Sequence, residues 1–204
     1  MKRNILSGAI SLFVITALFA FTINGSVLPI GSAIPKSDVK LQDVSGKMVT
    51  FKSAMKKNGL LVMFTCNTCP FVIKNQQRTK EICAYALQND IGVVLLNSNE
   101  AQRNDDDSYD AMKKYAKEQG YKWYYAMDKD NAIADAFGAG RTPECFLFAK
   151  DSKLSYHGAI DDNPTDANNV QRHHLKEAIN DFLAGKEVSV KESKSVGCSI
   201  KRKA

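Results

Sequence analysis

Two uninterrupted apolar runs dominate the middle of the chain, at residues 59–64 and 91–96. Runs of this length without polar alternation are typical of strands covered on both faces, so we expect two central strands of a sheet. Between them, residues 71–88 carry apolar side chains at wider spacing among basic and amide residues, which predicts a long helix. Pro70 fits the first turn of this helix, where no backbone donor is needed.

Mixed and alternating patterns predict the remaining elements. Apolar and polar residues alternate in 39–44 and 48–51, which predicts a β-hairpin, and a second hairpin is expected from 144–149 and 154–159. A short strand is expected over residues 123–127, and helices are expected over 53–57, 105–119, 131–137 and 166–183. The sequence therefore predicts an α/β fold in which helices flank a central mixed β-sheet that begins with an N-terminal hairpin.

Three consecutive aspartates, Asp105, Asp106 and Asp107, stand at the start of the helix expected over 105–119. Acidic side chains at this position cap the free backbone N–H groups and interact favourably with the helix dipole. We therefore expect them to be capping residues and not a calcium site.

The first 26 residues differ from the rest of the chain. Lys2 and Arg3 precede a largely apolar run over residues 5–23, and small residues follow it. This layout predicts a signal peptide or an N-terminal membrane anchor, because the run approaches the roughly 20 residues that span a bilayer. We expect export to the periplasm or another extracytoplasmic space, with a membrane tether if the segment is not cleaved.

The remaining residues predict one domain with short flanking segments. Residues 27–37 contain Pro and Gly and are expected to be a linker, 38–186 form the domain, and 187–204 form a polar, loosely packed C-terminal tail. The chain has 204 residues, of which 44% are hydrophobic and 25% charged, which are ordinary globular values. The net charge of +6 comes largely from the two ends of the chain. The sequence has no stripe of basic residues interleaved with aromatic ones, so we do not expect a nucleic-acid partner.

Cysteines supply the candidate chemistry. Cys66 and Cys69 are separated by two residues, directly after a predicted strand and directly before a predicted helix. A helix N-terminus favours thiolate over thiol, so we expect Cys66 to attack a disulfide and Cys69 to resolve the mixed disulfide. Cys83 and Cys145 fall in predicted core elements, whereas Cys198 lies in the tail as an idle cysteine or a third redox thiol.

Other interpretations of the two neighbouring cysteines remain open. They could form a structural disulfide, or hold a soft metal such as Cu(I), which thiolates bind well. A zinc site would need further ligands, and no second pair of this spacing exists in the sequence. Neither a cofactor nor a metal is expected.

Six short motifs in order along the chain resemble the thioredoxin-like superfamily, and within it the peroxiredoxin-like (AhpC/TSA, redoxin) branch. They are FTCNTCPFV (64–72), LNSN (96–99), DDSYDAM (106–112), GAGRTPE (138–144), GAIDDN (158–163) and GCSIK (197–201). The resemblance implies a thioredoxin-like fold in which Pro143 is a cis-proline next to Cys66 and Cys69. It also implies a substrate groove formed by five residues, namely Asn67, Thr68, Arg141, Thr142 and Pro143.

These observations lead to one main functional hypothesis and two alternatives. The main one is an exported thiol–disulfide oxidoreductase that acts on protein thiols and disulfides or on small thiols. A thiol-dependent peroxidase is the first alternative, although Thr65 is adjacent to Cys66 and not three residues before it, as the peroxiredoxin arrangement requires. The second alternative is a thioredoxin-like module that binds a soft metal or a partner without catalysis.

Overall fold

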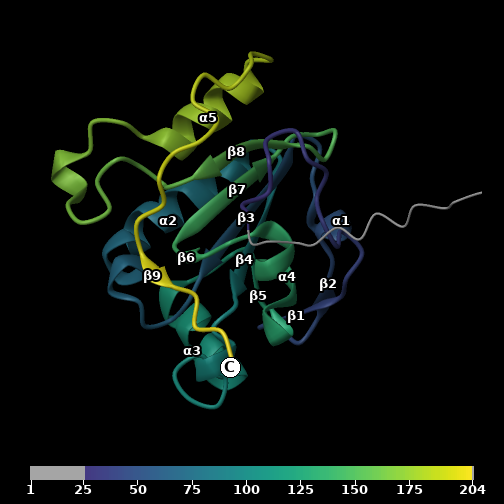
Figure 1. The fold of residues 1–204 in the computed structure, drawn as a ribbon, viewed down its shortest axis with the longest axis vertical. Helices are drawn as coiled ribbons and strands as arrows, with labels where there is room; N and C mark the ends of the chain where they lie inside the picture. The colour runs from purple at the N-terminus through teal and green to yellow at the C-terminus, as the bar shows by residue number, and fades with distance from the viewer. Residues whose placement is uncertain (1–25, 204) are drawn as a thin grey trace, which may run out of the picture.

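A seven-stranded mixed sheet forms the centre of the computed structural model, which describes residues 26–203 (Figure 1). The strands are β1 (Leu41–Asp43), β2 (Met48–Val49), β3 (Gly59–Thr65), β4 (Ile91–Asn97), β5 (Tyr124–Met127), β7 (Glu144–Phe148) and β8 (Leu154–Gly158). Their order across the sheet is β2-β1-β5-β4-β3-β7-β8. Strands β3, β4 and β5 are parallel, and the other pairings are antiparallel, so both predicted hairpins and the mixed sheet are confirmed.

The central strands β3 and β4 are buried along their whole length, as the apolar runs predict. Successive side chains of a strand point to opposite faces. Leu60, Val62 and Phe64 therefore join one hydrophobic cluster, while Leu61 and Met63 join the other. The two clusters are the two halves of the core, one on each face of the sheet.

Helices cover both faces of the sheet (Figure 1). They are α1 (Phe51–Ala54), α2 (Pro70–Gln88), α3 (Tyr109–Gln119), α4 (Ala132–Phe137) and α5 (His174–Leu183), with short 3-10 turns at Glu100–Gln102, Lys129–Asn131 and Ala167–Asn169. The buried residues of α1 and α4 belong to the first cluster, whereas Ile82, Cys83 and Ala86 of α2 and the buried residues of α3 and α5 belong to the second. Strand β3 and helix α2 are therefore both anchored by their buried side chains, which fixes the position of the junction between them.

Helix α4 is held to the sheet by aromatic packing. The ring of Phe137 lies 5.1–5.7 Å, centroid to centroid, from four other phenylalanine rings of the first cluster. Such aromatic pairs contribute about 0.5–1.5 kcal/mol each beyond the area they bury. Gly138 then ends the helix in the left-handed conformation, so the loop that follows starts from a fixed point.

Three helices begin at residues other than those predicted from the sequence. Helix α1 starts at Phe51 because Thr50 and Ser53 form a capping box there. Helix α3 starts at Tyr109, after Ser108 as its N-cap, and the three aspartates lie in the turn before it. Helix α5 starts at His174, since the preceding residues form turns in which side chains accept backbone N–H groups.

The segments on either side of the predicted domain pack against it. In residues 27–37, the predicted linker, Leu28 N–H donates to the carbonyl of Phe137 (2.9 Å) and Ile34 is buried. The expectation that the C-terminal tail is loosely packed is wrong. The tail, drawn in yellow in Figure 1, runs from α5 across the molecule and includes strand β9 (Cys198–Ser199), which pairs with β6 (Arg141–Thr142).

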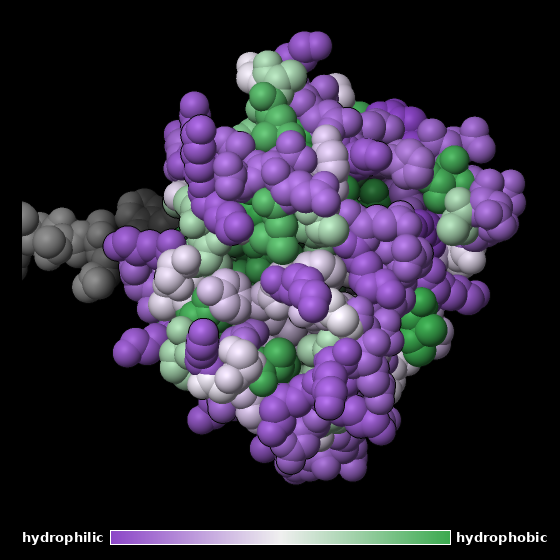
Figure 2. Space-filling model, turned by 180° about the vertical axis from the view of Figure 1, so that it is seen from behind, coloured by the Kyte–Doolittle hydropathy of each residue, from purple (hydrophilic) through white to green (hydrophobic). Residues whose placement is uncertain are grey.

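The surface in Figure 2 is mainly hydrophilic, with hydrophobic side chains in small patches between polar ones. Within residues 26–203, no helix is both long enough and apolar enough to cross a bilayer. The predicted export segment, residues 1–26, lies outside the described residues except for its last one.

Candidate redox site

Cys66 and Cys69 lie at the junction where β3 ends and α2 begins. Thr65 is the last residue of β3, Cys69 is the N-cap of α2, and Pro70 is its first residue. Both cysteines are thiols in this structure, and their residues are only 1% and 5% exposed. The strand is fixed by burial and the helix by its apolar face, so the position of the two sulfurs follows from the core.

The loop at Thr142 and Pro143 closes over the two sulfurs. The peptide bond between these residues is cis, as the resemblance implies. The hydroxyl oxygen of Thr142 lies 3.6 Å from the sulfur of Cys66. The sulfur of Cys69, when protonated, donates to the Thr142 carbonyl at 3.3 Å. The structure therefore brings together the two sequence motifs from which the site was predicted.

A buried carboxylate holds this loop. One oxygen of Glu144 accepts the backbone N–H groups of Gly140 (2.8 Å) and Arg141 (2.9 Å). Its other oxygen lies 2.7 Å from Nε2 of His157. Glu144 and His157 are 4% and 9% exposed. Sequence reasoning missed both residues, because no local pattern shows that a strand carboxylate turns back onto its own loop.

The other predicted groove residues behave differently from one another. Thr68 is exposed beside the cysteines. Asn67 is buried, and its side-chain oxygen accepts from the hydroxyl of Tyr125 (2.8 Å), so it supports the turn from inside and does not line a groove. The exposed guanidinium of Arg141 donates to the carbonyl of Gly197 in the tail (3.4 Å) and not to either sulfur.

Asp107 is fully buried beneath the turn that contains Cys66 and Cys69 (the CxxC turn), which the helix-capping expectation did not predict. Its carboxylate accepts from the backbone N–H of Asn67 (2.9 Å) and from the side-chain amides of Asn97 (2.6 Å) and Asn99 (2.8 Å). Ser108, and not an aspartate, caps α3. The LNSN motif (96–99) could have indicated this carboxylate, because its asparagine side-chain amides need an acceptor once they are buried.

A third thiol completes the site. Cys198 in β9 stands opposite Thr142 in the strand pairing, and it lowers the pKa of Cys69. It packs with the small hydrophobic cluster formed by Cys66, Cys69 and Val72. Cys198 is therefore part of the site and not a distant tail cysteine.

The remaining two cysteines lie in the core, as predicted. Cys83 and Cys145 are fully buried, and burial raises the pKa of both thiols. A thiol that stays protonated in an apolar environment is a poor nucleophile. These two residues therefore do not compete for the redox chemistry.

The interaction between the two site sulfurs shifts their pKa values in opposite directions. It raises the pKa of Cys66, as do burial and the negative charge of Asp107. It lowers the pKa of Cys69 to about 4, and Cys198 and the backbone N–H of Val72 lower it further. The sequence instead predicts that the lowered pKa belongs to Cys66.

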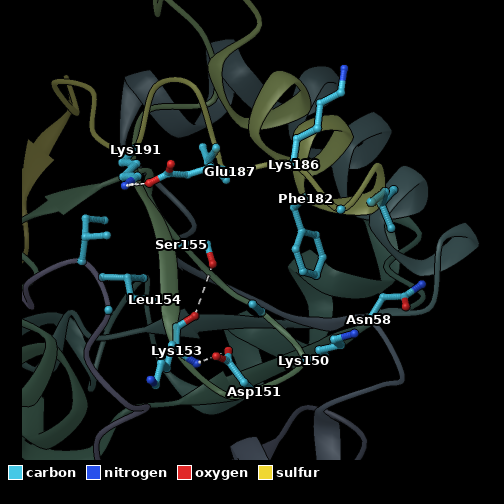
Figure 3. Close-up of a pocket in the computed structure, with 16 residues that line it drawn as sticks. Asn58, Lys150, Asp151, Lys153, Leu154, Ser155, Phe182, Lys186, Glu187 and Lys191 are labelled. Atoms are coloured by element: carbon cyan, nitrogen blue, oxygen red, sulfur yellow. Dashed lines mark hydrogen bonds and ion pairs between the residues drawn. The ribbon is translucent and has the colours of Figure 1, made fainter.

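A separate cavity of about 630 Å³ lies between β8 and the end of α5. Figure 3 shows lysines at its edge, together with the ion pair of Lys191 and Glu187, and no cysteine lines it. It is therefore distinct from the dithiol site. Residues 26–203 also contain no group of three or more His, Cys, Asp or Glu side chains arranged to hold a metal ion.

Residues 29–173 match the model of the redoxin family. The chain belongs to the redoxin family. A solved thioredoxin-like protein in the oxidised form, 20% identical with a TM-score of 0.58, shares the fold of this redoxin. The predicted thioredoxin-like fold is thereby confirmed.

Two solved structures resemble this redoxin over most of its length. A hypothetical protein from Sinorhizobium meliloti 1021 is 30% identical, covers 88% of this chain and 97% of its own, and gives a TM-score of 0.80. An uncharacterized conserved protein from Geobacillus kaustophilus is 33% identical, with coverages of 86% and 93% and the same TM-score of 0.80.

Among curated proteins, the thiol-disulfide oxidoreductase ResA of Bacillus thuringiensis (strain Al Hakam) is 26% identical over 150 residues, which is 74% of this chain and 79% of that protein. ResA of Bacillus anthracis gives the same identity and the same coverages. With its family and these relatives, the chain is a thioredoxin-like oxidoreductase.

Proposed function

We propose that this redoxin is an exported thiol–disulfide oxidoreductase that exchanges two electrons through Cys66 and Cys69. Its substrates are protein thiols and disulfides or small thiols. The observation that carries the proposal is the pair of sulfurs at the β3–α2 junction, which lie against the hydroxyl and carbonyl of Thr142.

The reaction needs only thiol–disulfide exchange. In the reducing direction, the thiolate of Cys66 attacks one sulfur of the substrate disulfide, and the other substrate sulfur leaves as a thiolate. The thiolate of Cys69 then attacks Cys66, which breaks the mixed disulfide and releases the second substrate sulfur. The enzyme ends with a Cys66–Cys69 disulfide and the substrate with two thiols, and the oxidising direction is the reverse.

The attack by Cys66 follows displacement of the tail. With the tail bound, Cys66 is 1% exposed and its pKa is raised, whereas the pKa of Cys69 is lowered. Displacement removes the Cys198 donors that favour a thiolate at Cys69, and it reduces the burial that disfavours one at Cys66. The hydroxyl of Thr142 remains beside Cys66, where it lowers the pKa of that thiol.

The test is reduction of insulin disulfides by the purified full-length protein, with dithiothreitol as electron donor. Cys66→Ser and Cys69→Ser variants should each lose the activity. Cys83→Ala removes a buried thiol outside the site and should retain it. A redox titration of the pair then gives the direction of electron flow, because 30 mV corresponds to about 1.4 kcal/mol for this two-electron couple.

Inactivity of the wild-type protein, together with a pair that never forms a disulfide, would refute the proposal. Stoichiometric Cu(I) retention under those conditions would favour the binding-module alternative. Peroxide reduction is not proposed, since within the described residues the groups beside the Cys66 sulfur are a hydroxyl and a thiol and not a guanidinium. Export is tested by cell fractionation and by the N-terminal sequence of the purified protein.

A further inference from the structure

The C-terminal tail is fixed to the domain on both sides of Cys198. Upstream, Ser193 N–H donates to the carbonyl of His157 (3.0 Å), and the hydroxyl of Ser193 accepts the N–H of Ala159 (2.9 Å). Downstream, Ile200 is 4% exposed within the first hydrophobic cluster, and its N–H donates to the carbonyl of Gly140 (3.1 Å). These contacts hold Cys198 at one position on the domain surface.

That position is the place where a thiol from a substrate would have to lie. Strand β9 pairs antiparallel with β6, which puts Cys198 opposite Thr142. Gly197 comes so close to this loop that a β-carbon on it would stand 2.1 Å from the Thr142 carbonyl oxygen. The chain therefore presents its own extended segment, with a cysteine in it, to the dithiol.

Contacts at the sulfurs identify which one Cys198 faces. The sulfur of Cys69 lies 3.3 Å from the carbonyl oxygen of Thr142, the residue that Cys198 faces in the strand pairing, and Cys198 lowers the pKa of Cys69. Cys198 packs against the cluster that contains both site cysteines. A disulfide between Cys66 and Cys69 would therefore present its Cys69 sulfur to a neighbouring thiol of the same chain.

We propose that Cys198 is a third redox thiol, which exchanges with the Cys66–Cys69 disulfide by attack on the sulfur of Cys69. The Cys69–Cys198 bond forms, the Cys66–Cys69 bond breaks, and Cys66 leaves as the thiolate. The proton lost by Cys198 is taken up by Cys66, so the step is an isomerisation of one disulfide into another and needs no external oxidant. It rests on the proposed function, which supplies the first disulfide.

The exchange gives the oxidised enzyme two forms. In one form the tail is free to leave and the Cys66–Cys69 disulfide is open to an external thiol. In the other form the tail is covalently attached over the groove, and Cys66 is again a thiol. The tail is thus an internal substrate: its thiol attacks the Cys69 sulfur and so competes with external thiols, which attack the Cys66 sulfur, for the same disulfide.

The experiment maps disulfides in the purified full-length protein. The protein is oxidised with oxidised glutathione, quenched with acid, alkylated with N-ethylmaleimide and digested without reduction. We expect Cys69–Cys198 peptides beside Cys66–Cys69 peptides in the wild type. In the Cys66→Ser variant, Cys198 should displace glutathione from Cys69, so that alkylation of Cys198 is lost.

A matched control moves the thiol by one residue, with Cys198→Ser and Ser199→Cys in the same chain. Neighbouring residues of a strand point to opposite faces, so this variant keeps the number of thiols but should yield no peptide that links the tail to Cys69. Full alkylation of Cys198 in the oxidised wild type and in Cys66→Ser, together with a normal Cys66–Cys69 disulfide and insulin reduction, would overturn the inference alone. A failure of the proposed function would instead abolish the Cys66–Cys69 disulfide and the insulin reduction.

Discussion

The buried carboxylate of Asp107 supports the CxxC turn and also opposes ionisation of Cys66. It accepts three hydrogen bonds, one from the backbone of Asn67 and two from the amides of Asn97 and Asn99. Its charge raises the pKa of Cys66. Substitution of Asp107 therefore separates a structural effect from an electrostatic one.

The cost of Asp107→Ala can be worked from these contacts. The two asparagine amides each keep a second acceptor, so each loses about 1 kcal/mol. The N–H of Asn67 has no second partner among the described residues, and burying it unpaired costs about 1–3 kcal/mol. We expect a loss of about 4 kcal/mol in the free energy of unfolding. Asp107→Asn keeps one acceptor oxygen and should lose about 1–2 kcal/mol.

The electrostatic effect is measured in a Cys69→Ser background, where Cys66 is the only thiol of the dithiol pair. Removal of a nearby negative charge stabilises the thiolate, so Asp107→Asn should move the pH midpoint of Cys66 alkylation to a lower value. The assay is the rate of iodoacetamide modification of Cys66 against pH, with denaturant unfolding of the same samples. An unchanged or higher midpoint, or equal destabilisation by the Asn and Ala variants, would refute the reasoning.

Three further predictions concern the tail, the core and the thiolate. Gly197→Ala cannot keep its approach to the Thr142 carbonyl and should lift β9, which is detected as faster alkylation of the dithiol. Arg78→Ala breaks a largely buried ion pair with Asp161 (2.6 Å) and should lower the free energy of unfolding by about 3–5 kcal/mol in denaturant titrations. The reduced protein should keep one thiolate down to about pH 4, because the pKa of Cys69 is lowered. The contribution of this thiolate to the free energy of unfolding is complete above the ordinary thiol pKa of 9.0 and is lost as the pH falls through 4. Ultraviolet absorbance measures the thiolate, and unfolding at several pH values measures the stability.

Each of these predictions has a direct control. Gly46→Ala changes a glycine whose added β-carbon would meet no atom within 4 Å, so it should leave the alkylation rate of the dithiol unchanged. Lys52→Ala breaks an exposed ion pair and should change the free energy of unfolding by less than about 1 kcal/mol. Cys69→Ser should remove the thiolate absorbance that persists at low pH. Equal effects of test and control variants would contradict the assignments.

The parts of the fold that were predicted are those whose pattern is local. Strands β3 and β4 are apolar throughout because both faces are covered, and that condition is visible in the residues themselves. The junction between β3 and α2 could be predicted for the same reason, and it contains Cys66 and Cys69. Thr142 and Pro143 came from the resemblance and not from periodicity.

The missed parts depend on contacts between distant residues. Asp107 precedes a serine and a helix, which is also how a capping aspartate looks, and only the tertiary structure brings Asn67 to it. The tail is polar apart from a few residues, so burial of Ile200 could not be read from its neighbours. The start of α5 was missed because turns built by Asp162 and Asn163 replace the first predicted helical residues.

Residues 200–202, beyond Cys198 in the tail, are fixed to the domain, and this determines how the site can open. Arg202 pairs with Asp135 (3.0 Å) and donates to the carbonyl of Ala139 (2.8 Å), so the segment beyond Cys198 is held to the domain. Release therefore requires a loop of residues 194–199 to bulge outward between two fixed ends, and not fraying from the terminus. Six residues span at most about 20 Å, which keeps the displaced thiol within a short distance of Cys69. A departing substrate therefore leaves the tail thiol already near the dithiol, with only a short movement needed to cover it again.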